Sequence, residues 1–120
     1  MREAEPEAID PGAFAELRET LGDDPFLADL IESYVRDAAR LVAAMRQAIV
    51  VRRADDLERA AHSLMGTSAS LGADVLPALC HDLVALARTG ALEGADGRLA
   101  AVEAEVVRVA EALQTLVRRA

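Results

Sequence analysis

The chain has 120 residues, of which 52% are hydrophobic and only 2% aromatic, and its formal net charge is −8 at pH 7. This length fits one domain, and the scarcity of aromatic residues argues against a β-sandwich or barrel, whereas the abundant Ala, Leu, Arg and Glu favour helices. The acidic charge argues against binding to nucleic acid or to an acidic membrane surface through a basic face.

The N-terminal half predicts two helices after a loose acidic segment at residues 1–9. The Asp-Pro pair at residues 10–11 is a helix start, because an N-cap side chain precedes a proline at the first helical position, and Gly22 ends this short helix. A second Asp-Pro pair, at residues 24–25, begins a long helix. The apolar residues of the long helix recur at spacings of three and four: Phe26, Leu27, Leu30, Ile31, Tyr34, Ala38, Leu41, Met45 and Ile49.

The C-terminal half predicts three further helices. The first of them begins at the Asp-Asp pair of residues 55–56 and runs to about Leu71, with Gly72 as its C-cap residue. Asp74 caps the next helix, which ends near Gly90. A looser stretch at residues 91–97 leads to the last helix, whose apolar positions are Leu99, Val102, Val106, Val109, Leu113 and Leu116.

The connections between these helices are short, so successive helices should be antiparallel neighbours. The expected fold is therefore all-α: the last four helices form an antiparallel up-down four-helix bundle, with the short N-terminal helix added as a lid. We expect residues 10–120 to form this domain. The apolar faces of the long helices can be satisfied within one bundle, so a monomer is expected.

His62 lies on the third predicted helix, and helical geometry directs it away from the core. At ~100° per residue, six residues form the core-facing stripe: Leu57, Ala60, Ala61, Leu64, Ser68 and Leu71. His62 lies ~140° from Leu57 by the same arithmetic, with Gly66 and Ala69 in its direction and Arg59 beside it. Gly66 costs a helix about 1 kcal/mol relative to Ala. Either it permits close helix packing, or it keeps access to the imidazole open.

The fourth predicted helix adds polar groups near His62. Its expected core stripe is Leu76, Leu79, Cys80, Leu83, Leu86 and Ala87. His81, Val84 and Arg88 share one shoulder of this helix at helical spacing. In a tight antiparallel hairpin about Gly72, Val84 comes level with His62. Two histidines and an arginine are thus expected to border one surface patch.

Residues 61–73, AHSLMGTSASLGA, are called the motif segment below, and they resemble the motif of bacterial histidine-containing phosphotransfer (HPt) domains, which is close to AHxLKGxSxxLGA. The likeness extends to residues 10–38 (DPGAFAELRETLGDDPFLADLIESYVRDA) and 76–90 (LPALCHDLVALARTG). The resemblance implies a four-helix bundle with an added N-terminal helix. It implies that His62 accepts a phosphoryl group from a receiver-domain aspartate, or from a histidine kinase, and relays it to another response-regulator receiver.

The resemblance also implies that the chain is a phosphoryl carrier and not an autonomous enzyme, because the partner supplies Mg²⁺ and most catalytic groups. No cofactor of its own is expected. The partners would be receiver domains and hybrid histidine kinases. The docking surface would centre on His62 and include Met65, Gly66, Ala69 and Val84, with Arg59 and part of the fourth-helix shoulder around it.

Two residues depart from the family pattern. Met65 stands where the family usually has a lysine that helps hold the phosphoryl oxygens, and Val84 stands where an acidic or amide residue often bonds the imidazole. Our hypothesis is that other polar residues take over part of this work: His81, Arg88, Arg59 and Ser63. The alternative is a degenerate module that docks receiver domains without being phosphorylated.

The remaining candidates have simpler explanations. Arg88 could do no more than pair with Glu58, a contact worth little when exposed. Ser68 is expected to bond a backbone carbonyl one turn back, and Cys80 to be a small core residue. A metal site made from His62, His81 and Cys80 is not expected, because Cys80 points inward.

Nothing in the sequence indicates a hydrolase or an ATP site, since there is no nucleophile elbow and no glycine-rich phosphate loop. The single cysteine excludes an intramolecular disulfide, and the acidic N-terminus lacks the apolar run of a signal peptide. No apolar stretch is long enough to span a membrane. A cytoplasmic location is therefore expected.

Overall fold

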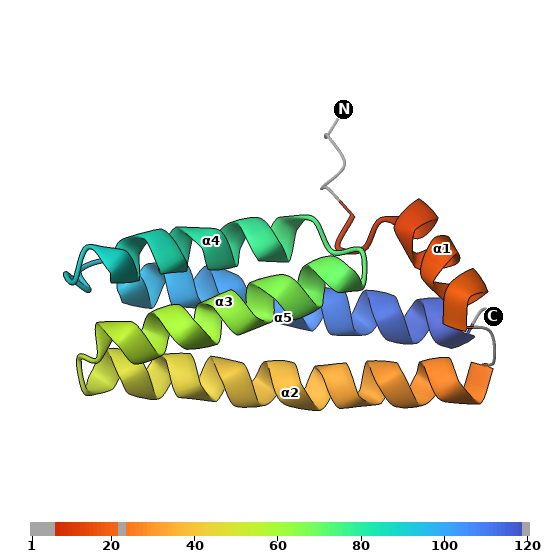
Figure 1. Cartoon of the computed structure of the whole chain (residues 1–120), viewed down its shortest axis with the longest axis horizontal. Helices are drawn as coiled ribbons and strands as arrows, with labels where there is room; N and C mark the ends of the chain where they lie inside the picture. Colours follow the sequence, from red (N-terminus) through yellow and green to blue (C-terminus); the bar gives the residue numbers. More distant parts are fainter. Residues whose placement is uncertain (1–6, 22–23, 119–120) are drawn as a thin grey trace.

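The computed structural model describes residues 7–21 and 24–118, and these residues form an antiparallel up-down bundle of four helices with a short additional helix (Figure 1). The helices are α1 (Pro11–Leu21), α2 (Asp24–Val50), α3 (Ala54–Ser70), α4 (Val75–Arg88) and α5 (Ala95–Arg118). Within the described part of the chain there is no strand, apart from an isolated antiparallel bridge between Ile9 and Ala73. The predicted all-α fold is confirmed.

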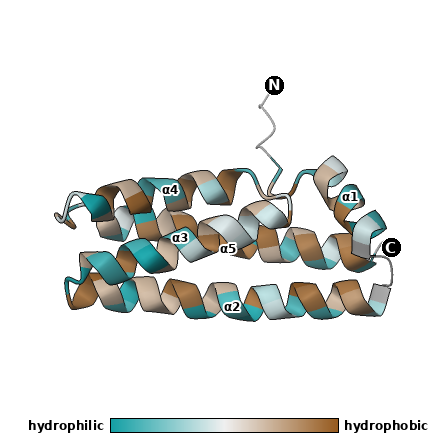
Figure 2. Cartoon of the chain, in the orientation of Figure 1, coloured by the Kyte–Doolittle hydropathy of each residue, from teal (hydrophilic) through white to brown (hydrophobic). Residues whose placement is uncertain are grey.

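The bundle is held together by the apolar stripes of α2 to α5, and Figure 2 shows apolar and polar residues alternating around each of these helices. All six residues of the stripe predicted for α3 are buried. The largest fully buried side chains include Leu27, Met45, Leu57, Leu64, Leu76, Leu83 and Leu113. Each such side chain contributes about 1.5–3 kcal/mol of burial free energy, so the core fixes the rotation of each helix about its axis.

Helix boundaries differ from the sequence expectation at the starts of two helices. α3 begins at Ala54, one residue early, and α5 begins at Ala95, so residues 95–97 are helical and not loose. Ala95 is fully buried, and Asp96 in the first turn suits the positive end of the helix dipole. Asp74 occupies the N-cap position of α4 as predicted, but its side chain makes no capping hydrogen bond. Gly22, expected to end α1, lies outside the described residues.

The segment before α1 is packed against the bundle, which corrects the expectation of a loose lead-in at residues 1–9. Ala8 and Ile9 are buried, and the Asp10 N–H donates to the Gly72 carbonyl oxygen at 2.8 Å. Burial of these two apolar side chains lowers the free energy of the folded chain, whereas a solvated tail would leave them exposed to water. Residues 1–6 of that predicted segment lie outside the described part. The Asp10 side chain caps α1 as expected, since Oδ1 accepts from the Gly12 N–H at 3.0 Å.

Gly72 allows the chain to turn from α3 into α4 while α1 crosses close by. Its φ is +89°, a conformation that glycine adopts at little cost. A Cβ at this position would lie 3.0 Å from the Cβ of Ala13 on α1. Gly72 is therefore required both by the backbone and by the close approach of α1, which lies across the end of the bundle where α2 begins (Figure 1).

Over the described ranges, no helix combines the length and the apolar character that a membrane span requires.

Candidate functional site

His62 projects from the outward side of α3 and is exposed to solvent. Its neighbours Ala61 and Leu64 are fully buried, and their packing sets the direction in which the imidazole points. One turn later Gly66 is also exposed, and a Cβ built on it would meet no atom within 4 Å. Gly66 therefore does not serve close helix packing, and open access to His62 stays a prediction.

A shallow hollow of about 410 Å³ surrounds one side of His62. Its lining comes from two helices: Asp55, Glu58, Arg59, His62 and Ser63 from α3, and Arg88 from α4. Three of the residues predicted to support the histidine, Arg59, Ser63 and Arg88, are thus brought together with it. The predicted register of the hairpin is also confirmed, because the Arg88 Nε–H donates to Glu58 Oε2 at 2.9 Å.

Both arginines at this hollow already have a carboxylate partner. Arg88 pairs with Glu58, and Arg59 Nη1 lies 3.6 Å from Oδ1 of Asp56. The two arginine side chains are 65% and 77% exposed, so each pair adds no more than about 1 kcal/mol to stability. Weak pairs of this kind leave the guanidinium groups free to change partners at small cost.

Val84 does not lie on the surface, and its predicted part in docking is wrong. It is only 4% exposed and belongs to the core between α3 and α4. The buried stripe of α4 is rotated toward Val84, which leaves Leu79 and Leu86 on the opposite flank only partly buried. The predicted stripe was centred too far toward those two leucines.

The other candidates near the histidine differ in accessibility. Ala69 is exposed, as expected for a docking residue, whereas Met65 is partly buried and packs against the core. His81 is exposed on α4 but is not among the residues that line the hollow. The patch predicted to hold two histidines and an arginine therefore forms with His62 and Arg88, and His81 lies outside its lining.

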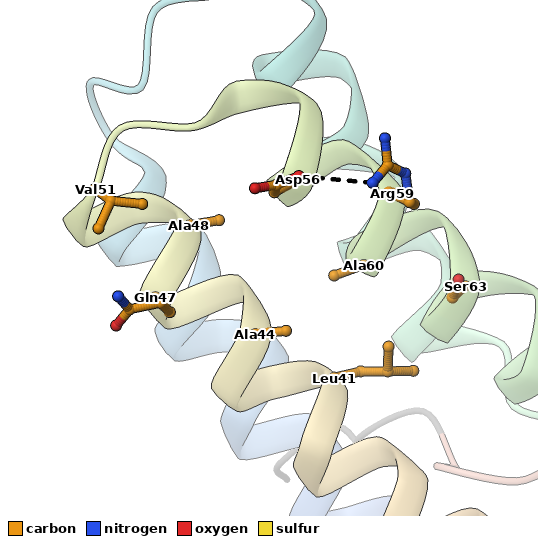
Figure 3. Close-up of a pocket in the computed structure, with 9 residues that line it drawn as sticks. All are labelled: Leu41, Ala44, Gln47, Ala48, Val51, Asp56, Arg59, Ala60 and Ser63. Carbon is orange, nitrogen blue, oxygen red and sulfur yellow. Dashed lines mark ion pairs between the residues drawn. The ribbon is translucent and has the colours of Figure 1, made fainter.

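A groove of about 420 Å³ runs between α2 and α3 and adjoins this hollow (Figure 3). Leu41, Ala44, Gln47, Ala48 and Val51 line it from α2, and Asp56, Arg59, Ala60 and Ser63 from α3. Arg59 and Ser63 line both depressions, so the two are adjacent. This groove was not predicted from the sequence, although its apolar residues Leu41, Ala44, Ala48 and Val51 recur along α2 at spacings of three and four.

Two polar groups are buried beneath the motif segment. The Tyr34 and Ser68 hydroxyl oxygens lie 2.7 Å apart in a hydrogen bond between α2 and α3, so Ser68 is bonded to a side chain where a backbone carbonyl was expected. Burial raises the pKa of Tyr34, an effect that the Ser68 hydrogen bond partly offsets.

Cys80 is fully buried, as predicted, and burial raises the pKa of its thiol to about 12. The thiol therefore stays protonated and unreactive at neutral pH. Within residues 7–21 and 24–118, no three His, Cys, Asp or Glu side chains are grouped as metal ligands would be.

Comparison with known proteins matches residues 29–118 to the Hpt domain family. The crystal structure of histidine-containing phosphotransfer protein B (HptB) from Pseudomonas aeruginosa PAO1 is similar to this chain, with a TM-score of 0.85 and 26% sequence identity. The similarity covers 94% of this chain and 96% of that protein. No curated protein matches the chain. The range matched by the family includes all of α3 and α4, with His62 and the hollow beside it.

Proposed function

Because the chain belongs to the Hpt domain family, whose members carry phosphoryl groups in phosphorelays, we propose that His62 is the residue on which this chain carries the group. His62 accepts a phosphoryl group from a receiver-domain aspartate, or from a histidine kinase, and relays it to another response-regulator receiver. The observation that carries this proposal is the exposed imidazole on α3 with open space at Gly66 one turn later.

Phosphoryl transfer requires that a partner can reach the His62 imidazole, and it depends less on catalytic groups from this chain. A neutral imidazole nitrogen offers a lone pair, the bond to phosphorus forms there, and the phosphorus–oxygen bond of the aspartyl phosphate breaks. The transition state is loose, so positioning and charge stabilisation dominate. A side chain on a helix leans toward the helix N-terminus, so a larger residue at 66 would cover His62. Gly66 leaves that approach free for a partner that brings Mg²⁺ and its acidic pocket.

Three residues beside His62 would contact the transferred group in place of the lysine that Met65 replaces: Arg88, Arg59 and Ser63. All three line the hollow. His81 is not part of this set because it lies outside that lining. The chain thus acts as a carrier, and the partner performs catalysis.

The docking surface would comprise Gly66, Ala69 and the groove between α2 and α3. Its apolar residues suit the apolar centre of a partner's interface, and the charged residues of the hollow form the rim. The domain would span the predicted residues 10–120 together with the buried Ala8 and Ile9. A cytoplasmic location fits the unpaired Cys80, and a monomer remains our expectation.

The test is transfer of radiolabelled phosphate from a phosphorylated receiver domain in the presence of Mg²⁺. His62→Gln should abolish acid-labile label on the chain, whereas the matched control His81→Gln should keep it. Both side chains are exposed, so neither change should alter the free energy of unfolding by more than about 0.5 kcal/mol. Label retained in His62→Gln would contradict the proposal. Receiver binding without label would support the docking module instead.

A further inference from the structure

The Glu58–Arg88 ion pair lies directly beside His62, and nothing in the mechanism above uses the glutamate. Both residues line the hollow that His62 borders. The Arg88 Nε–H donates to Glu58 Oε2 at 2.9 Å, and the two side chains are 65% and 33% exposed. The pair also joins α3 to α4, so the position of the guanidinium depends on the carboxylate.

A phosphoryl group on His62 would change the balance of charge in this hollow. Phosphorylation adds a charge of −1.5 to −2 at pH 7 and three strong acceptor oxygens, by analogy with other phosphorylated side chains. Arginine pairs well with phosphate as well as with carboxylate, and the more highly charged phosphoryl group is the stronger partner. Glu58, in contrast, repels the phosphoryl group. The two anions therefore compete for one cation.

We propose that Glu58 competes with the phosphoryl group of His62 for the Arg88 guanidinium, so that this ion pair sets how readily the phosphoryl group leaves. The inference rests on the proposed function, because it needs His62 to be phosphorylated. Glu58 is a positioning residue that acts through Arg88. By binding the Arg88 guanidinium, Glu58 weakens the contact of Arg88 with the phosphoryl group, and the nitrogen–phosphorus bond breaks more readily during transfer to a receiver.

The step affected is breakage of the nitrogen–phosphorus bond. In transfer, an aspartate oxygen of the receiver forms the new bond to phosphorus. In hydrolysis, water does so and releases inorganic phosphate. In both cases the imidazole nitrogen keeps the electron pair and later takes up a proton. Arg88 bound to the phosphoryl oxygens holds the group on His62, and Glu58 weakens that hold.

The test uses the full chain without any partner. Phosphoramidate, a small-molecule phosphodonor, labels His62 in a chain that carries His81→Gln, because His81 is also exposed, and ³¹P NMR then follows the lifetime of the phosphohistidine in this parent and its variants. Glu58→Gln should lengthen this lifetime about threefold, and Arg88→Gln should shorten it about threefold, the size expected for exchange within an exposed ion pair. The double variant should match Arg88→Gln alone. In urea, where the chain is unfolded, all lifetimes should be equal.

The matched control is Glu103→Gln, which removes the carboxylate of another ion pair between helices, Arg46–Glu103 on α2 and α5. Its lifetime should equal that of the parent chain. A lifetime that is unchanged or shorter in Glu58→Gln would overturn the competition, and so would a Glu58 effect that persists without Arg88. Absence of any phosphohistidine at position 62 in the parent chain would instead overturn the proposed function, and the inference with it.

Discussion

The motif segment contains two glycines six residues apart, and their surroundings are opposite. Gly66 faces solvent, with no atom within 4 Å of where its Cβ would be. Gly72 has a φ of +89° and lies against Ala13 of α1. The first glycine leaves room for something outside the chain, whereas the second is needed by the chain itself.

The same contrast extends to the residues around them. Around His62, one turn before Gly66, exposed charged side chains line the hollow, and their ion pairs are weak. Toward Gly72 the helix presents Ser68, bonded to Tyr34 inside the core, with the protonated thiol of Cys80 also buried there. A single helix thus separates an outer side, at which we propose that transfer occurs, from an inner side that is buried in the core. Variants on the two sides should change different quantities.

The largest effect is expected on the inner side, where high pH should lower the free energy of unfolding. Burial raises the pKa of Cys80 from 9.0 to about 12 and also raises that of Tyr34, so the folded state keeps protons that the unfolded state releases. The contribution of these protons to the free energy of unfolding is complete below pH 9 and is lost as the pH rises toward 12. For the thiol alone the loss is about 1.4 kcal/mol per pH unit, or on the order of 4 kcal/mol over this range. Urea unfolding at several pH values measures it. Cys80→Ala should give a shallower slope, and an equal slope would contradict the assignment.

On the outer side, Gly66→Leu should reduce phosphoryl transfer from a receiver by about 100-fold, or about 2.7 kcal/mol of activation free energy. The leucine side chain would lean over His62, while leucine is a better helix former than glycine. Rates are measured by label transfer and stability by thermal unfolding. Unchanged transfer would show that Gly66 does not control access. A loss of folding would show that its surroundings are not open.

Gly72→Ala should destabilise the fold by about 2 kcal/mol. The alanine would have to adopt a left-handed conformation and would also crowd Ala13. Urea unfolding gives the change in free energy. At a temperature where the variant stays folded, its rate of phosphoryl transfer should be close to that of the parent chain. A loss of transfer without a loss of stability would contradict a purely structural role for Gly72.

Tyr34→Phe should cost about 1–2 kcal/mol of stability, because the Ser68 hydroxyl loses its buried partner. Replacing both residues, in Tyr34→Phe with Ser68→Ala, should recover part of that loss, since no hydroxyl is then left unpaired. The double-mutant cycle is completed by the unfolding free energies of Tyr34→Phe, Ser68→Ala and the double variant. Purely additive losses would mean that the two hydroxyls do not act as a pair.

The smallest effect is expected for Gly66→Ala, which should raise stability by up to about 1 kcal/mol, because alanine favours a helix and the new Cβ meets nothing. Gly97→Ala is the matched control, since its Cβ also meets nothing within 4 Å. Thermal unfolding measures both. Only the change at position 66 should also slow transfer, and the reverse pattern would contradict the role of Gly66.

Periodicity was sufficient to predict most of this fold. All six residues of the α3 stripe are buried. A tight hairpin about Gly72 also predicts the register in which Arg88 of α4 lies opposite Glu58 of α3, and the two are hydrogen-bonded. Those features depend on helical spacing and on one tight turn, both of which are local. The choice of His62 came from the resemblance to a family, because an exposed histidine alone indicates little.

The features that were missed depend on how helices are rotated and paired. Val84 and Leu86 lie on opposite flanks of the α4 stripe, and only packing against α3 decides which of them is buried. The Tyr34–Ser68 hydrogen bond joins helices through side chains whose contact no spacing rule gives. The α2–α3 groove likewise exists only once two helices meet.

The bridge between Ile9 and Ala73 connects the start of the described chain to the turn that follows the motif segment. Closing so long a loop costs entropy that is recovered only after α2 and α3 have paired, so this contact should form late in folding. The Asp10 amide proton, bonded to the Gly72 carbonyl, is then a natural reporter for hydrogen exchange. The Ile9–Ala73 bridge and the Asp10–Gly72 hydrogen bond thus join the segment before α1 to the turn at the C-terminal end of α3, the helix that carries His62.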